Sequence, residues 1–156
     1  MIKPFHPGVG RDLLDSAQTS PLVMIVEDDP HVRRPIAELL KLHGMRVVEA
    51  ANADEALDAL GRGEPNLVIA DVMMRGKPEG FDVCWKIKTN PATNHCYVIM
   101  LTGLSDPSDI DSARERGADQ YLVKPVSMGM LWEIISKLGV IIMPDVSAET
   151  PPARLN

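Results

Sequence analysis

Five short apolar segments recur along the chain, separated by stretches in which apolar residues stand three or four positions apart. The segments are 22–26, 45–50, 66–70, 97–101 and 119–123. They are rich in β-branched residues, and several lack the polar alternation of a strand that has one exposed face. This pattern is typical of a parallel sheet that is covered on both faces. We therefore predict five parallel strands.

The stretches after these strands have the spacing of amphipathic helices. The five stripes are Val32, Ile36, Leu39, Leu40 and His43; Ala53, Ala56, Leu57 and Leu60; Phe81, Cys84 and Trp85; Ile110, Ala113 and Gly117; and Leu131, Ile134, Ile135 and Leu138. Alternation of strands and helices predicts a doubly wound α/β fold. Pro35 interrupts the first helix by removing a backbone donor, so we expect that helix to begin late or to kink.

The ends of the chain have less pattern than its middle. We predict a flexible N-terminal extension over 1–20, one domain over 21–143, and a disordered tail or linker over 144–156. A chain of 156 residues is long enough for one sizeable core. The apolar run 139–144 is consistent with an added strand, a helix extension or an interface.

Composition narrows the class of protein. A formal net charge of −6 and a sequence pI near 5.1 argue against direct binding to nucleic acid or to an anionic membrane. No apolar run approaches the length of a membrane span, and the N-terminus lacks the apolar core of a signal peptide, so we expect a cytoplasmic protein. Cys84 and Cys96 have no partner at metal-finger spacing and are expected to be packed, reduced thiols.

Polar groups stand where four of the strands end. Glu27 and Asp28 follow the first strand, Asp71 the third, Thr102 the fourth and Lys124 the fifth. Each alone has an ordinary explanation, as a helix cap, a solvated acid, a turn hydroxyl or a surface cation. Sites in open α/β sheets lie at the carboxyl ends of the strands, so we expect these groups to meet.

Three successive carboxylates also require a counter-charge. Glu27, Asp28 and Asp29 follow one another directly. Like charges about 4 Å apart repel by on the order of 4 kcal/mol at an effective dielectric near 20. We expect a positive group to offset this repulsion, and we expect Asp29 to cap the following helix.

Four motifs resemble the response-regulator receiver domain of two-component signalling. They are "VMIVEDDP", "LVIADVMM" with Asp71, "VIMLTGL" with Thr102, and "YLVKP" with Lys124 and Pro125. The resemblance covers residues 21–143. It implies a flavodoxin-like (βα)5 fold with a five-stranded parallel sheet in the order 2-1-3-4-5. It also implies a phosphorylation-dependent signalling switch, which catalyses nothing beyond its own phosphoryl transfer and dephosphorylation.

The resemblance assigns a role to each residue at the strand ends. Asp71 would be the phosphoacceptor. Mg²⁺, or Mn²⁺ in its place, would be bound by Asp28 and Asp71, by Glu27 through a water, and by the backbone carbonyl of Met73. These are the oxygen ligands that a hard divalent cation prefers.

The same resemblance implies a switch on the other side of the acceptor. Thr102 and Lys124 would bind the phosphoryl oxygens, and Tyr121 corresponds to the family's aromatic switch position. Pro125 follows a peptide bond that is prone to be cis. The phosphoryl group would change the surface of the fourth helix, fifth strand and fifth helix.

Partners follow from this interpretation. A sensor histidine kinase or a histidine phosphotransfer protein would donate the phosphoryl group, and a downstream protein would read the altered surface. Trp132 lies off its helix stripe and is a candidate contact for a partner or for a homodimer. Packing against a neighbouring helix is the alternative for Trp132.

One departure from the family pattern lies after the acceptor. Many receivers have a proline where this chain has Arg75, and the loop before Gly80 is about one residue longer. We therefore expect a loop of different shape. Arg75 and Lys77 could approach the phosphoryl group or the partner, or simply be solvated.

Two other functions compete with the switch. A receiver-fold scaffold that never carries phosphate would usually have lost part of the acidic pocket, the acceptor or the lysine. A metal-dependent phosphatase would usually place a second aspartate two residues after the first, where this chain has Met73. The sequence leaves open whether the chain is a single-domain regulator or a piece of a longer protein.

Overall fold

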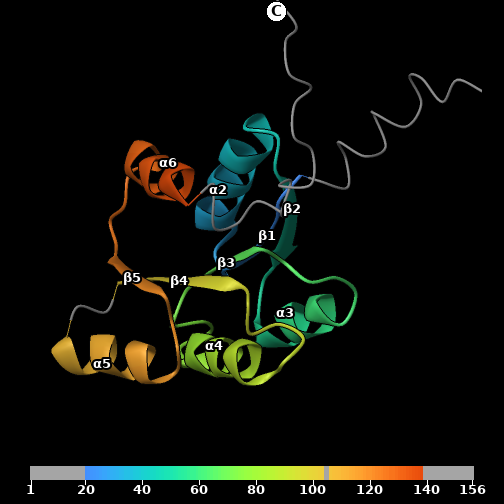
Figure 1. The fold of residues 1–156 in the computed structure, drawn as a ribbon. Helices are drawn as coiled ribbons and strands as arrows, with labels where there is room; N and C mark the ends of the chain where they lie inside the picture. The colour runs from blue at the N-terminus through green and yellow to red at the C-terminus, as the bar shows by residue number, and fades with distance from the viewer. Residues whose placement is uncertain (1–19, 104–105, 139–156) are drawn as a thin grey trace, which may run out of the picture.

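A five-stranded parallel sheet forms the centre of the molecule in a computed structural model that describes residues 20–103 and 106–138 (Figure 1). The strand order is β2-β1-β3-β4-β5, which confirms the predicted fold class. The strands are β1 (Leu22–Val26), β2 (Arg46–Ala50), β3 (Leu67–Ala70), β4 (Tyr97–Thr102) and β5 (Gln120–Val123). The helices are α2 (Pro30–Leu42), α3 (Ala53–Leu60), α4 (Glu79–Thr89), α5 (Pro107–Glu115) and α6 (Met128–Lys137).

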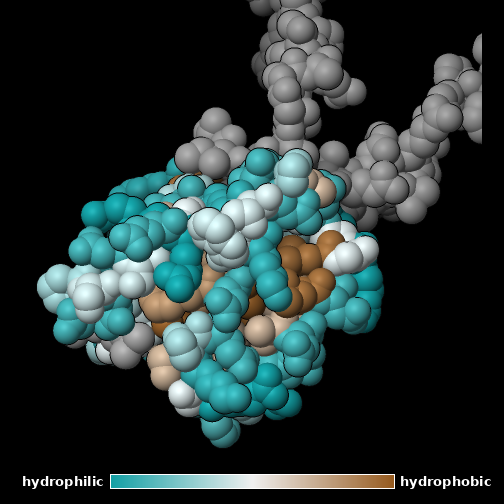
Figure 2. All heavy atoms as spheres, turned by 90° about the horizontal axis from the view of Figure 1, so that it is seen from below, coloured by the Kyte–Doolittle hydropathy of each residue, from teal (hydrophilic) through white to brown (hydrophobic). Residues whose placement is uncertain are grey.

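The helices cover both faces of the sheet. Helices α2 and α6 lie on one side, and α3, α4 and α5 lie on the other (Figure 1). Alternate residues of β1 therefore enter different apolar clusters: Val23 and Ile25 pack with α2 and α6, whereas Met24 and Val26 pack with the other three helices. This two-sided burial is why the segments of β1, β3 and β4 are continuously apolar. On the face of α3, α4 and α5, hydrophilic residues predominate and apolar residues show between the helices (Figure 2).

The start of α2 differs from the expectation. Oδ1 of Asp29 accepts a hydrogen bond from the backbone N–H of His31 at 2.8 Å, so Asp29 is the N-cap, as predicted. Pro30 suits the first helical position because its missing N–H is not needed there. These two residues fix the start ahead of Pro35, and the helix continues through Pro35. Of the two alternatives, the late start is therefore wrong, and the kink stays a prediction.

Two tryptophans illustrate the limits of stripe spacing. The stripe spacing predicts that Trp85 is buried with Phe81 and Cys84, but Trp85 is 52 % exposed, and α4 buries Ile87 with the other two residues. Trp132 is half-buried, and its ring stacks on that of His43 with 3.5 Å between the centroids and 22° between the planes. The structure thus shows Trp132 packed against the C-terminal end of α2.

Several expectations fall outside the described residues. These are the expectations for the N-terminal extension apart from Ser20, for the run 139–144 and for the tail 144–156. Among the described residues, no helix is long and apolar enough to span a membrane.

Candidate functional site

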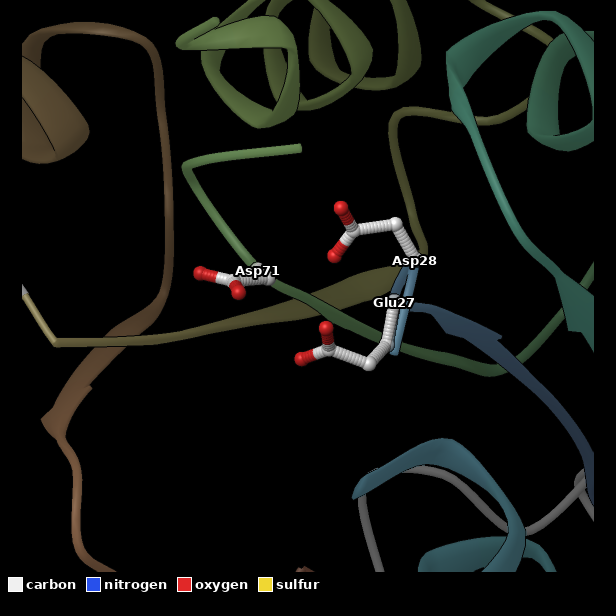
Figure 3. Close-up of side chains that lie close together, drawn as sticks. All are labelled: Glu27, Asp28 and Asp71. Carbon is white, nitrogen blue, oxygen red and sulfur yellow. The ribbon is translucent and has the colours of Figure 1, made fainter. Parts of the chain in front are cut away.

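Three carboxylates meet beyond the ends of two neighbouring strands. β1 and β3 pair in parallel, with Val26 beside Ala70, so the residues that follow them emerge side by side. One carboxylate oxygen from each of Glu27, Asp28 and Asp71 lies within 4.8 Å of the others, and Figure 3 shows the three side chains converging. Glu27 and Asp71 are buried. The predicted meeting of acids at this edge of the sheet is confirmed.

Lys124 supplies the positive charge that the acids require. Its Nζ lies 2.8 Å from Oε2 of Glu27 and 3.0 Å from Oδ2 of Asp71. The lysine follows β5, whereas the acids follow β1 and β3, so the contact joins three parts of the chain at one edge. Because the ammonium group of Lys124 contacts both Glu27 and Asp71, its positive charge offsets the repulsion between these two carboxylates.

Each carboxylate also accepts a backbone N–H. Oε1 of Glu27 accepts from Asp29 at 3.1 Å, and Oδ1 of Asp71 accepts from Met73 at 3.3 Å. Oδ2 of Asp28 accepts from Arg75 at 2.9 Å. Hydrogen bonds to an ionised acceptor are stronger than those between neutral groups, so the local backbone stabilises the charged pocket.

The surroundings shift the pKa values of Glu27 and Asp28 in opposite directions. Burial raises the pKa of Glu27, against the lowering effect of its hydrogen bond to Lys124. The backbone N–H of Arg75 lowers the pKa of Asp28. Burial alone would lower the pKa of Lys124, but its hydrogen bonds to Glu27 and Asp71 outweigh burial and raise it. The lysine therefore remains a fixed positive charge in the pocket.

Thr102 and Tyr121 lie on adjacent strands. Thr102 is fully buried at the end of β4, and its carbonyl accepts the backbone N–H of Lys124 at 2.7 Å. A side-chain hydrogen bond joins Thr102 to Tyr121, and burial raises the pKa of the Tyr121 phenol. The Lys124–Pro125 peptide bond is cis. The residues predicted to form the switch are therefore connected to the lysine and to one another.

Arg33 belongs to the surroundings of the pocket and was not predicted. Its guanidinium donates to the backbone carbonyl of Glu27 at 2.7 Å and lies 3.2 Å from Oε1 of Glu49. An arginine on a helix normally indicates a solvated face, and its acceptor here is a carbonyl that no sequence motif identifies. The arginine fixes the backbone that presents the first acid.

The loop after Asp71 packs closely against the start of α4, and its expected difference from other receivers stays a prediction. Gly80 packs against it so closely that a Cβ atom there would lie 1.9 Å from the carbonyl oxygen of Asp71. The backbone N–H of Gly80 donates to the carbonyl of Val72 at 2.9 Å. Between Val72 and Gly80 the chain reverses in a tight turn at Arg75 and Gly76.

The donor set fits a hard divalent cation. Three carboxylates with oxygens within 4.8 Å of one another share a single lysine, which leaves uncompensated negative charge. Mg²⁺ binds in proteins through one or two carboxylates and several waters. The residues present are therefore suitable ligands for this ion.

The fold and this pocket together define a receiver-type signalling domain. The family model for the response regulator receiver domain matches residues 23–136. The chain belongs to the response-regulator receiver domain family.

Relatives agree with this assignment. The chain is 39 % identical over 105 residues to "Probable transcriptional regulator ycf27" of Porphyridium aerugineum, covering 67 % of this chain and 42 % of the relative. It is 36 % identical over 105 residues to "Protein PilG" of Pseudomonas aeruginosa, covering 67 % of this chain and 77 % of that protein. The chain thus spans less than half the length of the first relative.

Solved structures show the same fold. The receiver domain of a signal transduction histidine kinase from Syntrophus aciditrophicus has a TM-score of 0.72 at 29 % identity, covering 85 % of this chain and 99 % of that one. A BeF3-activated DrrB receiver domain has a TM-score of 0.66 at 28 % identity, covering 76 % of this chain and 96 % of that one.

Proposed function

We propose that this domain is a phosphorylation-dependent switch in which Asp71 accepts a phosphoryl group from a histidine kinase or a histidine phosphotransfer protein. The main support is the contact of Lys124 with both Glu27 and Asp71 in a pocket that also contains Asp28. A nucleophilic carboxylate, a fixed cation and further acids are the groups that phosphoryl transfer to an aspartate needs. The BeF3-activated relative is consistent with the same pocket chemistry.

Mg²⁺ or Mn²⁺ would be bound by the side chains of Asp28 and Asp71, by Glu27 through a water and by the carbonyl of Met73. When bound, the ion neutralises charge on the phosphoryl oxygens. Glu27 is suited to an indirect role because one of its oxygens is hydrogen-bonded to Lys124 and the other to the backbone of Asp29.

In the transfer step, a carboxylate oxygen of Asp71 forms a bond to phosphorus. The bond between phosphorus and the donor imidazole nitrogen breaks, and that nitrogen keeps the electron pair and is protonated by water. The ammonium of Lys124 binds the developing charge on the phosphoryl oxygens, and the hydroxyl of Thr102 closes on them.

The phosphoryl group then changes the contacts of the residues that bind it. Lys124 replaces its contact with Glu27 by a contact with a phosphoryl oxygen. Thr102 likewise gives up its hydrogen bond to Tyr121 for one to a phosphoryl oxygen. Tyr121 is on β5, so the change reaches the surface of α5, β5 and α6, where a downstream protein or a second copy of the chain would bind. The relative named as a transcriptional regulator is consistent with a role in signalling to gene expression.

Intact mass after incubation with acetyl phosphate tests the acceptor. Wild-type protein with Mg²⁺ should gain one phosphoryl group, and Asp71→Asn should gain none. Asp29→Asn is the matched control, because it also removes one neighbouring carboxylate but preserves the N-cap acceptor, and it should still be phosphorylated. The proposal is wrong if neither acetyl phosphate nor a set of histidine kinases modifies the wild type, or if Asp71→Asn is modified equally.

A further inference from the structure

The loop between β3 and α4 reverses through a two-residue hairpin. The backbone N–H of Met74 donates to the carbonyl of Lys77 at 2.9 Å, and the N–H of Lys77 donates to the carbonyl of Met74 at 3.0 Å. The two residues between them have positive φ, 52° at Arg75 and 74° at Gly76. Reciprocal hydrogen bonds around two such residues are typical of a type I′ turn.

Arg75 is an unusual residue for the first position of this turn. Glycine, asparagine and aspartate are preferred there, and other side chains pay on the order of 1 kcal/mol for the left-handed conformation. Among the described residues, Arg75 is the one non-glycine residue with positive φ. Its ion pair with Glu79, at 3.3 Å, involves a side chain that is 54 % exposed, and exposed pairs contribute little.

The turn has a clear effect on the candidate metal site. It directs the N–H of Arg75 onto Oδ2 of Asp28, which lies 47 positions earlier in the chain, at 2.9 Å. Asp28 is more exposed than Glu27 or Asp71 and has no ion pair with Lys124 among the described contacts. The N–H therefore restrains the one acid that the lysine does not hold.

We propose that the Arg75–Gly76 turn is a positioning element, in which the backbone N–H of Arg75 orients the Asp28 carboxylate for binding a divalent cation. The inference rests on the proposed function for the identity of the metal ligands. Proline, which many receivers have at this position, has no N–H and a φ near −65°. It therefore cannot donate this hydrogen bond or adopt the positive φ of the turn. The turn thus adds a contact to the pocket.

Two substitutions of the same residue separate the N–H from the side chain. Arg75→Gly and Arg75→Pro both remove the guanidinium and its pair with Glu79, but Arg75→Gly retains the N–H and accepts positive φ. Loss of a partner that orients a metal ligand typically weakens metal binding by about 10- to 100-fold. Calorimetry with Mg²⁺ should show affinity within about twofold of wild type for Arg75→Gly and about tenfold weaker for Arg75→Pro.

A phosphorylation assay gives a second readout that loss of general stability would not produce. For Arg75→Pro, the Mg²⁺ concentration for half-maximal phosphorylation should rise about tenfold, while the rate at saturating Mg²⁺ stays near that of wild type. Equal Mg²⁺ affinity in folded Arg75→Pro and Arg75→Gly would overturn the inference. If Arg75→Pro does not fold, Gly76→Val replaces it, because a β-branched residue at positive φ opens the same turn.

The outcomes distinguish this inference from the proposed function. Wild-type protein that binds Mg²⁺ but accepts no phosphoryl group would contradict the proposed function, while the difference between the two Arg75 variants in calorimetry would still support the positioning role. Normal phosphorylation of the wild type, together with unchanged Mg²⁺ affinity in Arg75→Pro, would contradict the positioning role alone.

Discussion

Lys124 and Glu27 form a largely buried ion pair, 2.8 Å from Nζ to Oε2, although 97 positions of sequence separate them. Removing one partner of such a pair leaves the other charge without compensation. Lys124→Met should therefore lower the free energy of unfolding at pH 7 by about 3 kcal/mol, measured by urea titration without metal.

Lys86→Met is the control for the loss of a lysine, because Lys86 is exposed and in no ion pair among the described residues. It should change stability by less than about 0.5 kcal/mol. Similar losses in the two variants would mean that the pocket lysine contributes little to folding.

Asp28→Asn should have a small effect without Mg²⁺ and a large one with it. Without the ion, stability should fall slightly, because the lowered pKa of Asp28 means that its charge favours the folded state, while the amide oxygen still accepts the N–H of Arg75. With Mg²⁺ at about 100 times its Kd, wild type should gain about 2.7 kcal/mol, whereas the variant should gain much less. Thermal unfolding at several Mg²⁺ concentrations checks both effects, and an equal gain in the variant would exclude Asp28 as a ligand.

Gly80→Ala should be strongly destabilising because its Cβ would meet the carbonyl of Asp71 at 1.9 Å. Overpacking against backbone should cost about 3 kcal/mol and reduce phosphorylation of Asp71. Gly129→Ala in α6 is the matched control, since nothing lies within 4 Å of its Cβ position. That control should raise stability by up to about 1 kcal/mol through helix propensity. Chemical denaturation of both variants compares the two sites directly.

The free energy of unfolding should fall at alkaline pH because the buried thiols of Cys84 and Cys96 resist ionisation in the folded state. Burial raises the pKa of Cys84 and of Cys96 from 9.0 to about 11. A raised folded-state pKa gives stability that is complete below pH 9.0 and is lost as the pH rises through about 11. The free energy of unfolding of wild type should decline across this window relative to a Cys84→Ala, Cys96→Ala double variant. A constant difference between the two proteins would contradict the prediction.

The strands and the positions of most site residues could be predicted because buried strands require runs of apolar residues, and these runs are visible in the sequence. Every predicted strand lies within one residue of its observed bounds. Burial on both faces makes the central strands β1, β3 and β4 continuously apolar, whereas the edge strands β2 and β5 are partly exposed and contain polar residues. Glu27, Asp71 and Lys124 were found because charged residues stand at the carboxyl ends of such strands. Their positions are confirmed, but the roles of all the site residues in metal binding and phosphoryl transfer stay predictions.

Features made by the backbone or by neighbouring helices could not be predicted. The N–H of Arg75 and the carbonyl that Arg33 contacts belong to every residue type, so no side chain marks them. The start of α2 depended on Asp29 and Pro30 more than on Pro35. The exposure of Trp85 depended on which face α4 turns to the sheet, and the spacing of Phe81 and Cys84 alone does not determine that face.

The stack of Trp132 on His43 gives the chain a built-in optical reporter. The indole belongs to α6, which is part of the surface proposed to change, and the imidazole belongs to His43, the residue directly after α2. A shift of α6 would alter the distance between the two rings and hence the quenching of the indole emission. With Trp85 replaced by phenylalanine, fluorescence from Trp132 alone would follow such a shift in real time, without an attached dye.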